Sequence, residues 1–285
     1  MPILGFAPNG LTSIESYGFS EYNGLQVTVR RQLSHGIQFQ GAYTWGKDLT
    51  DVEGVGFNSV FLGGDGNSND PSNRHQRWGP ADFDRAQRFV LTYLWEIPHP
   101  NGEGFIHRKV LSGWSLSGVT TFQSGLPLTI TDPTGGTIFG SASNSRAELC
   151  PGFTQAQVAT PGGVESRLNN YFNAAAFCAP PAIGDGAGYG DTGRAAFRGP
   201  HQANFDAGLI KTTKVGGLSE AAALEFRADF YNAFNHPQFA VPGTTFTGIH
   251  IDPKTNKAVA NGNFGQIQAT SVAPRLIQFG LKYIF

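Results

Sequence analysis

The stretch that decides the expected fold is RLIQFGLKYIF, from Arg275 to Phe285. Large apolar side chains occupy every second position from Phe279 to Phe285. Polar or small residues, such as Gln278 and Lys282, occupy positions of the other set. Successive side chains of a β-strand point to opposite faces. The stretch therefore predicts a strand with one apolar face and one polar face.

The same alternation recurs in six earlier segments, so we expect seven or eight strands. Their apolar positions are Leu25, Val27 and Val29; Ile37, Phe39, Tyr43 and Trp45; Phe89, Leu91, Tyr93, Trp95 and Ile97; Trp114, Leu116 and Phe122; Phe205, Ala207 and Leu209; and Leu224, Phe226, Ala228 and Phe230. The composition agrees, because only 14% of the residues are charged, 12% are aromatic and 38 are Gly. Such a chain is typical of many strands joined by turns and loops.

The connections between these segments alternate between short and long. The long ones, rich in polar residues, cover Gly46–Arg85, Thr131–Gln202 and Asn235–Gly262. Membrane barrels show this sorting, with short periplasmic turns and long extracellular loops. Strands of about 9 to 11 residues also have the length needed to cross a bilayer when tilted. The sequence thus predicts an all-β, transmembrane antiparallel barrel segment whose C-terminus lies on the periplasmic side.

The polar positions of the strands are expected to face a wet lumen, and their apolar neighbours to face lipid, where a central Arg or Lys would cost about 2–4 kcal/mol. The lumen-facing candidates are Arg30, Gln38, Gln40, Glu225, Arg227, Asp229 and Lys282. The two carboxylates that flank Arg227 favour a solvated ion-pair ladder over general acid–base catalysis. A large soluble β-sandwich also alternates, and it is the structural alternative.

Two further sets of residues suggest specific roles. Phe279, Leu281, Tyr283 and Phe285 resemble the signal by which the barrel-assembly machinery recognises outer-membrane clients, and the alternative is an ordinary edge strand. Cys150 and Cys178 lie in one segment rich in Pro and Gly. In an oxidising compartment they could close a loop of about 28 residues, stabilising it by roughly 3 kcal/mol. Two unpaired thiols are the other interpretation.

Other classes of function find little support. No apolar run reaches the roughly 20 residues of a membrane helix, and the net charge of −1 gives no basic field for nucleic acid. No metal-ligand spacing or catalytic set emerges, so we expect neither an enzyme nor a cofactor. The residues from Met1 do not form a signal peptide. A barrel without a signal peptide cannot be exported alone, so we expect either that the true start lies elsewhere or that the chain is a fragment.

Several segments, in order along the chain, resemble the Oar-like TonB-dependent transporters, a family of large outer-membrane barrels. They are Tyr22–Val27, Tyr43–Lys47, Asp84–Phe89, Gly113–Trp114 with Gln123–Pro127, Tyr171–Asn173 with Ala176–Phe177, Gly193–Arg194 with Arg198–Pro200, Glu225–Pro237 and Pro274–Phe285. The resemblance implies a barrel of about 22 strands around a plug. The motifs that match belong to the last third of such a barrel, so the resemblance implies that residues 1–285 are the C-terminal part of an outer-membrane barrel. On this expectation the plug, the TonB-binding motif and the other N-terminal domains of the family are not part of this sequence.

The resemblance implies a location in the outer membrane of a diderm bacterium. It also implies import of an unidentified small molecule, glycan or peptide, driven through TonB by way of the N-terminal region. The expected partners are outer-membrane lipid, TonB, the barrel-assembly machinery and that substrate. Two other functions stay open: an outer-membrane adhesin or structural surface barrel, and a secreted soluble β-protein that binds glycans.

Overall fold

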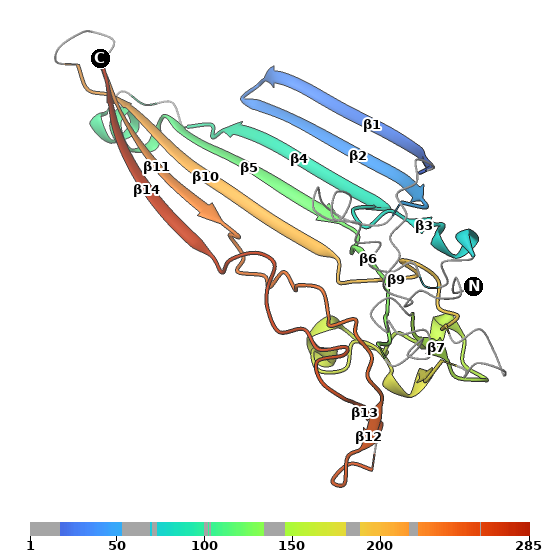
Figure 1. Cartoon of the computed structure of the whole chain (residues 1–285). Coiled ribbons are helices and arrows are strands. Elements are labelled where there is room, and N and C mark those ends of the chain that lie inside the picture. Colours follow the sequence, from blue (N-terminus) through green and yellow to red (C-terminus); the bar gives the residue numbers. More distant parts are fainter. Residues whose placement is uncertain are drawn as a thin grey trace.

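The computed structural model describes residues 18–52, 69, 73–99, 102, 104–133, 146–180, 189–216, 222–256 and 258–285. Its main element is one antiparallel sheet of seven long strands in chain order, with a short eighth strand at one edge (Figure 1). The long strands are β1 (Ser20–Ser34), β2 (Ile37–Thr50), β4 (Gln87–Glu96), β5 (Trp114–Gln123), β10 (Gln202–Lys214), β11 (Ala223–Tyr231) and β14 (Leu276–Ile284), and β3 (Gly79–Pro80) pairs with the end of β2. This confirms the expected seven or eight strands and their antiparallel order.

The tightest connection shows how local sequence fixes a hairpin. His35 and Gly36 join β1 to β2, and both have positive φ angles, 52° and 74°. Two consecutive residues with positive φ form a type I′ turn, whose twist matches that of antiparallel strands. Gly36 has no Cβ, and a Cβ there would lie 2.9 Å from the carbonyl oxygen of Glu96. His35 and Gly36 thus form a two-residue hairpin turn between Ser34 and Ile37.

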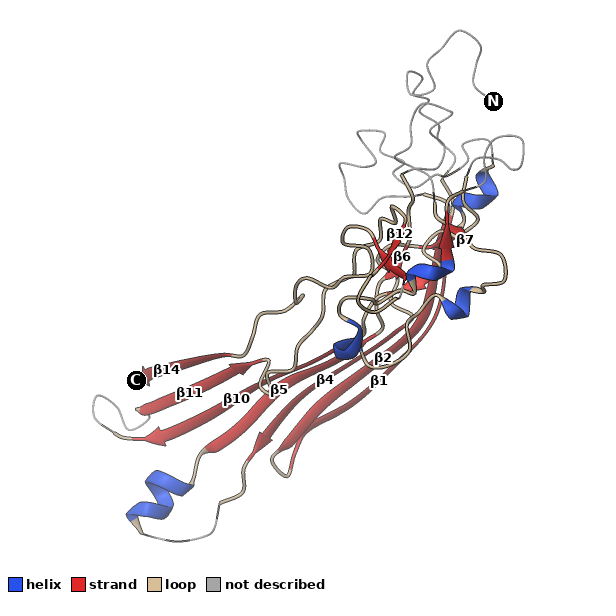
Figure 2. Ribbon diagram, turned by 90° about the horizontal axis from the view of Figure 1, so that it is seen from below, coloured by secondary structure: helices blue, strands red, loops and turns tan. Residues whose placement is uncertain are grey.

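The connections sort by length onto the two ends of the sheet. The short-connection end carries the β1–β2 turn, the described parts of the segments 97–113 and 215–222, and the C-terminus (Figure 1). The long-connection end carries the described parts of the segments 51–86, 124–201 and 232–275, which gather together there (Figure 2). The predicted alternation of short and long connections is therefore confirmed in space.

Three strands are longer than the sequence predicts. β1 has 15 residues, β2 has 14 and β10 has 13, against the expected 9 to 11. The expected loop Gly46–Arg85 is wrong at its start, because Gly46–Thr50 continues β2 and pairs with Ser20–Gly24 of β1. The expected loop Thr131–Gln202 likewise ends too late, since Gln202 already pairs with Gln123. Backbone pairing extends these strands through polar and small residues that the alternation of apolar residues does not mark.

The long connections fold into a compact body, which we call the loop assembly (described residues within 124–201 and 232–275). Its buried apolar cluster comprises Leu128, Ile130, Ala147, Val158, Tyr171, Phe172, Ala174, Ala176, Phe177, Phe197, Phe246, Phe264 and Ile267. Its short elements are β6 (Pro127–Leu128), β7 (Glu148–Leu149), β8 (Phe177–Cys178), β9 (Phe197–Arg198), β12 (Ile249–Ile251), β13 (Ala258–Ala260) and the 3-10 helices η4 (Gln155–Gln157), η5 (Val164–Arg167) and η6 (Ala174–Ala176). The apolar core of the described chain therefore lies in these connections rather than on the sheet.

Outside the loop assembly the described chain has two further short helices, η1 (Arg74–Arg77) and the π-helix η2 (His107–Leu111). No helix of the described residues has the length and hydrophobicity to span a membrane. Within the described residues the two outer strands of the sheet, β1 and β14, each pair on one side only. A strand in lipid must have its backbone groups paired, so both edges require a neighbouring strand.

Candidate functional site

One face of the seven-stranded sheet is apolar from edge to edge. The register aligns Leu25 with Trp45, Tyr43 with Phe89 and Phe89 with Phe122. Further along, Leu116 aligns with Leu209, Leu209 with Ala228 and Ala228 with Phe279. Many of these side chains stay open to solvent in the isolated chain; Leu25 is 53% exposed, and Phe279 is 67% exposed. A soluble sandwich would cover such a face with a second sheet.

The tightest packing on the apolar face is between aromatic side chains and glycine. Tyr93 lies over Gly118 of the neighbouring strand, and a Cβ on Gly118 would collide with the Tyr93 hydroxyl and lie 2.6 Å from the carbonyl oxygen of Asp206. Phe122 stacks on Phe89 at 6.4 Å between ring centroids and meets Phe205 edge-on at 5.4 Å. Because Gly118 has no side chain, the Tyr93 ring of the adjacent strand can occupy the space above it.

The opposite face carries every residue that the sequence assigns to the lumen. Arg30 of β1 pairs with Gln40 of β2, and Gln38 lies two residues before Gln40 on the same face of β2. At the other edge of the sheet, Glu225 pairs with Lys282 and Asp229 with Gln278, with Arg227 between the two carboxylates. The structure thus places these seven residues on one face, in two groups, at the β1–β2 side and at the β11–β14 side. Their exposure to an aqueous lumen stays a prediction.

The polar face contains a hydrogen-bonded ladder at β10 and β11. Arg227 Nε donates to both carboxylate oxygens of Asp229, at 2.9 and 2.7 Å. Asp206 accepts from Asn204 Nδ2 at 3.0 Å and from the backbone N–H of Asn232 at 2.8 Å. The expected ion-pair ladder is therefore present between Arg227 and Asp229. Glu225 stands opposite Lys282 in register.

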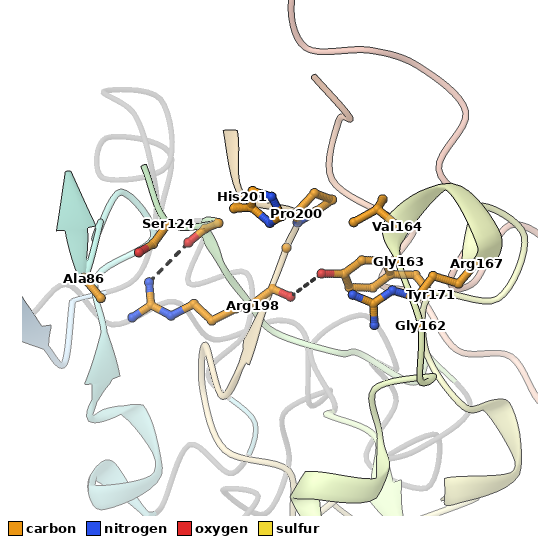
Figure 3. Close-up of a pocket in the computed structure, with 12 residues that line it drawn as sticks. Ala86, Ser124, Gly162, Gly163, Val164, Arg167, Tyr171, Arg198, Pro200 and His201 are labelled. Carbon is orange, nitrogen blue, oxygen red and sulfur yellow. Dashed lines mark hydrogen bonds between the residues drawn. The ribbon is translucent and has the colours of Figure 1, made fainter. Parts of the chain in front are cut away.

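A pocket of about 450 Å³ opens where the loop assembly meets the ends of β4 and β5 (Figure 3). Its lining comprises Ala86, Ser124, Gly125, Gly162, Gly163, Val164, Arg167, Tyr171, Arg198, Gly199, Pro200 and His201. The lining therefore combines two guanidinium groups, a phenol, an imidazole and exposed glycine backbone. A concave site with convergent polar groups is a candidate for ligand binding. The sequence did not predict it, because its residues come from four separate segments.

Arg198 connects the pocket to the sheet. Its guanidinium donates to the Asp84 carboxylate at 2.5 Å and to the Asp84 carbonyl oxygen at 3.1 Å. Asp84 Oδ1 also accepts from the backbone N–H of Asp48 at 3.0 Å. On the other side, the Arg198 carbonyl oxygen accepts from the Tyr171 hydroxyl at 3.0 Å (Figure 3). One residue of β9 thus links β2, the segment before β4 and the loop assembly.

Positive charge exceeds negative charge beside the pocket. Burial, followed by the repulsion of Arg88 and Arg198, lowers the pKa of Arg85 from its ordinary value. Arg85 donates to the Ser124 carbonyl oxygen of the pocket wall. Across the pocket, Arg167 donates to the Thr160 carbonyl oxygen at 2.6 Å and lies 4.4 Å above the Tyr171 ring. Such a surface is suited to polar or anionic solutes.

Cys150 and Cys178 form a disulfide in the structure, with 5.0 Å between their Cα atoms. The bond lies beside the β7–β8 pair, whose residues Glu148 and Cys178 are partners. Asp191 binds both residues of β7. Its N–H donates to Glu148 Oε2 at 2.7 Å, and its Oδ1 accepts from the Leu149 N–H at 2.9 Å. Burial and the nearby Asp191 carboxylate raise the pKa of Glu148.

The remaining candidates take structural positions. No group of three or more His, Cys, Asp or Glu side chains that could hold a metal occurs in the part of the chain that the structure describes. Asn69 Nδ2 donates to Gln76 Oε1 at 2.7 Å and to the Gly190 carbonyl oxygen at 2.8 Å. Its Oδ1 accepts from the Arg146 N–H at 3.0 Å, so Asn69 fastens the segment before β3 to the loop assembly.

A curved antiparallel sheet with one largely apolar face across its seven long strands, and with connections sorted by length, is typical of transmembrane β-barrel proteins. A protein-family model described as "Outer membrane beta barrel domain" matches residues 2–278, and the chain belongs to this family. The chain matches no curated protein and no solved structure. The expected fold class is thereby confirmed, and membership of this family indicates a location in the outer membrane.

Proposed function

We propose that this chain forms part of the barrel of a TonB-dependent transporter that imports a solute across the outer membrane. The observation that carries the proposal is the pocket between the loop assembly and the sheet, lined by Arg167, Tyr171 and Arg198. The ordered motifs from Tyr22 to Phe285 that resemble the Oar-like family support it. On this proposal the long-connection end faces the medium, and the C-terminus faces the periplasm.

The loop assembly suits an import receptor better than a passive pore. The segments 124–201 and 232–275 bind each other directly: Tyr171 N–H donates to the Gly265 carbonyl oxygen at 2.8 Å, and Ile267 N–H donates to the Leu168 carbonyl oxygen at 2.7 Å. Phe246 N–H also donates to the Thr131 carbonyl oxygen at 2.7 Å. Connections held in one arrangement position contacts for a ligand, because little ordering remains to oppose binding.

The proposal assigns roles to three other surfaces. The apolar face contacts outer-membrane lipid, and the polar face with Arg30, Glu225 and Arg227 lines the path of the solute. The last strand, with Phe279, Leu281, Tyr283 and Phe285, delivers the chain to the barrel-assembly machinery. TonB acts on an N-terminal region of the transporter rather than on this segment. We propose no catalytic step for any of these surfaces.

Uptake by cells tests the proposal. The probes are a radiolabelled ferric siderophore, an oligosaccharide and an oligopeptide, given to cells with and without the gene for this chain. We expect the gene to be required for uptake of one probe, and deletion of TonB to abolish that uptake. In the same cells, Arg167→Gln removes a charged donor of the pocket, a loss of about 1.5–3 kcal/mol or roughly 10- to 100-fold in apparent affinity.

Lys254→Gln is the matched control for Arg167→Gln. Lys254 is exposed in the turn between β12 and β13, away from the pocket, and its substitution should leave uptake unchanged. Uptake of all three probes that is independent of both the gene and TonB would reject the proposal. Uptake that needs the gene but not TonB would indicate a passive channel.

An outer-membrane adhesin is the second candidate, and one observation favours it. The β12–β13 hairpin projects from the loop assembly (Figure 1), and its side chains Ile249, Ile251 and Val259 are 41%, 56% and 38% exposed. Exposed apolar side chains on a projecting hairpin suit contact with another protein. Ile251→Asn should then reduce attachment of cells to a surface without changing solute uptake.

A further inference from the structure

The connection between β4 and β5 exposes an unusual amount of apolar surface. Residues 105–111 form one helical segment that includes η2 (His107–Leu111). Within it Phe105 is 72% exposed, Ile106 is 62%, Val110 is 49% and Leu111 is 41%. A solvent-facing turn has no reason to carry four large apolar side chains. The segment lies at the short-connection end of the sheet, beyond the last residues of β4 (Figure 2).

Two contacts place this segment beside the apolar face of the sheet. Trp114, which shares that face with Leu116, donates from Nε1 to the Val110 carbonyl oxygen at 2.8 Å. Lys211 is paired with Trp114, and its ammonium group donates to the Ser112 carbonyl oxygen. Both donors therefore reach from the lipid-facing surface to the end of the helical segment. The exposed side chains of the segment continue that surface at its rim.

Positive charge accompanies the apolar side chains at this level. The Lys211 ammonium group lies 5.6 Å from the Trp114 ring centroid, and Lys109 donates to the Lys214 carbonyl oxygen. A lysine at the rim of an apolar surface holds its ammonium group at the depth of lipid phosphates, while its methylene groups stay among apolar neighbours. Amphipathic helices that lie in the plane of a bilayer surface combine the same two features.

We propose that residues 105–111 are an interfacial anchor that inserts into the phospholipid leaflet bordering the short-connection end. Phe105, Ile106, Val110 and Leu111 enter the boundary between head groups and acyl chains, and Lys109 contacts lipid phosphate. Lys211 is buried and holds the end of the segment through the Ser112 carbonyl oxygen. The anchor holds the sheet at a fixed depth. It is continuous with the apolar face of the family fold, and that continuity favours lipid over a second protein chain as its occupant.

Fluorescence quenching by lipid tests the anchor. Phe105→Cys, in the full chain inserted in phosphatidylcholine vesicles, is labelled with a bimane, and the lipid acyl chains carry bromine as the quencher. The native cysteines are joined to each other, so the new thiol is the one that reacts. Phe279→Cys, in the middle of the apolar face, is the positive control. Phe83→Cys, 65% exposed at the long-connection end, is the negative control.

We expect bromine close to the head groups to quench the label at position 105 by about half, because an interfacial helix lies about 5–10 Å into the boundary. Bromine deep in the acyl chain should instead quench the label at position 279. The label at position 83 should keep its fluorescence with both lipids. Absence of quenching at position 105, with quenching retained at position 279, would overturn the anchor while leaving the membrane sheet intact.

Two further results complete the test. Addition of phosphatidylglycerol should strengthen the quenching at position 105, and Lys109→Gln should remove that increase, because lysine is attracted to anionic lipid. A label at position 105 that is protected from aqueous iodide but is not quenched by brominated lipid would point to a protein occupant. That outcome would also overturn the proposal.

Discussion

At the scale of single residues, glycine and arginine determine how the sheet and the loop assembly fit together. Gly118 leaves space for the Tyr93 ring on the apolar face. Arg194 is 3% exposed and donates to the carbonyl oxygens of Thr50 at 2.6 Å and Val52 at 3.1 Å, which holds the loop assembly to the end of β2. Buried backbone carbonyls need such partners, since an unsatisfied one costs about 1–3 kcal/mol.

Gly118→Ala should destabilise the sheet. The new methyl group meets the Tyr93 hydroxyl and the Asp206 backbone, and overpacking of this kind costs about 1–3 kcal/mol. The measurement is the midpoint of urea unfolding in detergent micelles, followed by tryptophan fluorescence. Gly280→Ala is the control, because its Cβ would lie 3.9 Å from Arg227 Cβ, an ordinary van der Waals contact. Equal midpoints for the two variants would contradict the close packing of Tyr93 on Gly118.

The Glu148 carboxyl predicts a pH dependence of stability. Its pKa in the folded chain is raised above the ordinary 4.5 by burial and by Asp191. The folded state therefore holds the proton more tightly than the unfolded state, and the stabilisation present below the unfolded pKa is lost as the pH rises through the folded pKa. Glu148→Gln does not titrate, and its amide oxygen can still accept the Asp191 N–H.

Thermal unfolding of both proteins between pH 4 and pH 7 checks this prediction. The melting temperature of the native chain should fall relative to that of Glu148→Gln as the pH rises. Curves that stay parallel over the whole interval would show that the carboxyl pair does not affect stability. Asp252→Asn is a useful comparison, because the pKa of the Asp252 carboxyl is shifted in the opposite direction: it is lowered, chiefly by the Lys254 N–H.

At the scale of elements, the sequence predicted the seven long strands and their two faces but not the loop assembly. The alternation in segments such as Phe89–Ile97 shows directly which residues share the apolar face, because side chains in a strand alternate between faces. The core of the loop assembly follows no such period. Ile130, Val158 and Phe246 are buried together although they lie far apart in the sequence. The pocket depends on the same long-range packing and so could not be predicted.

The two faces of β14 make a prediction at this scale. Leu281 is on the apolar face and Gln278 on the polar face. Leu281→Arg should cost about 2–4 kcal/mol, the penalty of an arginine in the middle of a lipid-facing strand. Gln278→Arg adds the same side chain to the same strand and should be tolerated. The measurement is urea unfolding of both variants in phospholipid vesicles, and a similar loss in both would contradict the assignment of the faces.

At the scale of the whole molecule, the chain has two unlike ends joined by one sheet. The short-connection end has tight turns and the C-terminus, and the long-connection end has the loop assembly with its pocket (Figure 1). This asymmetry fits the proposed transport function, in which ligand binding would occur on one side of the membrane and release on the other.

Thiol labelling on intact cells tests which end faces outward. Lys254→Cys introduces a thiol in the β12–β13 turn, and Ser34→Cys introduces one beside the β1–β2 turn; both native residues are exposed. A maleimide that cannot cross the outer membrane should label position 254 on intact cells. It should label position 34 only after the outer membrane is permeabilised. The reverse pattern would invert the proposed orientation.

The Cys150–Cys178 bond constrains the order of biogenesis. Disulfides form in the oxidising periplasm, whereas the proposed orientation brings this bond to the cell exterior. The bond encloses a stretch with a sequence separation of 28. On the proposed orientation, the cross-linked stretch has to cross the bilayer as a closed loop, which is wider than a single extended chain. If the proposed orientation holds, the assembly machinery needs a lateral opening wide enough for the closed loop, or the bond has to form after the loop has passed.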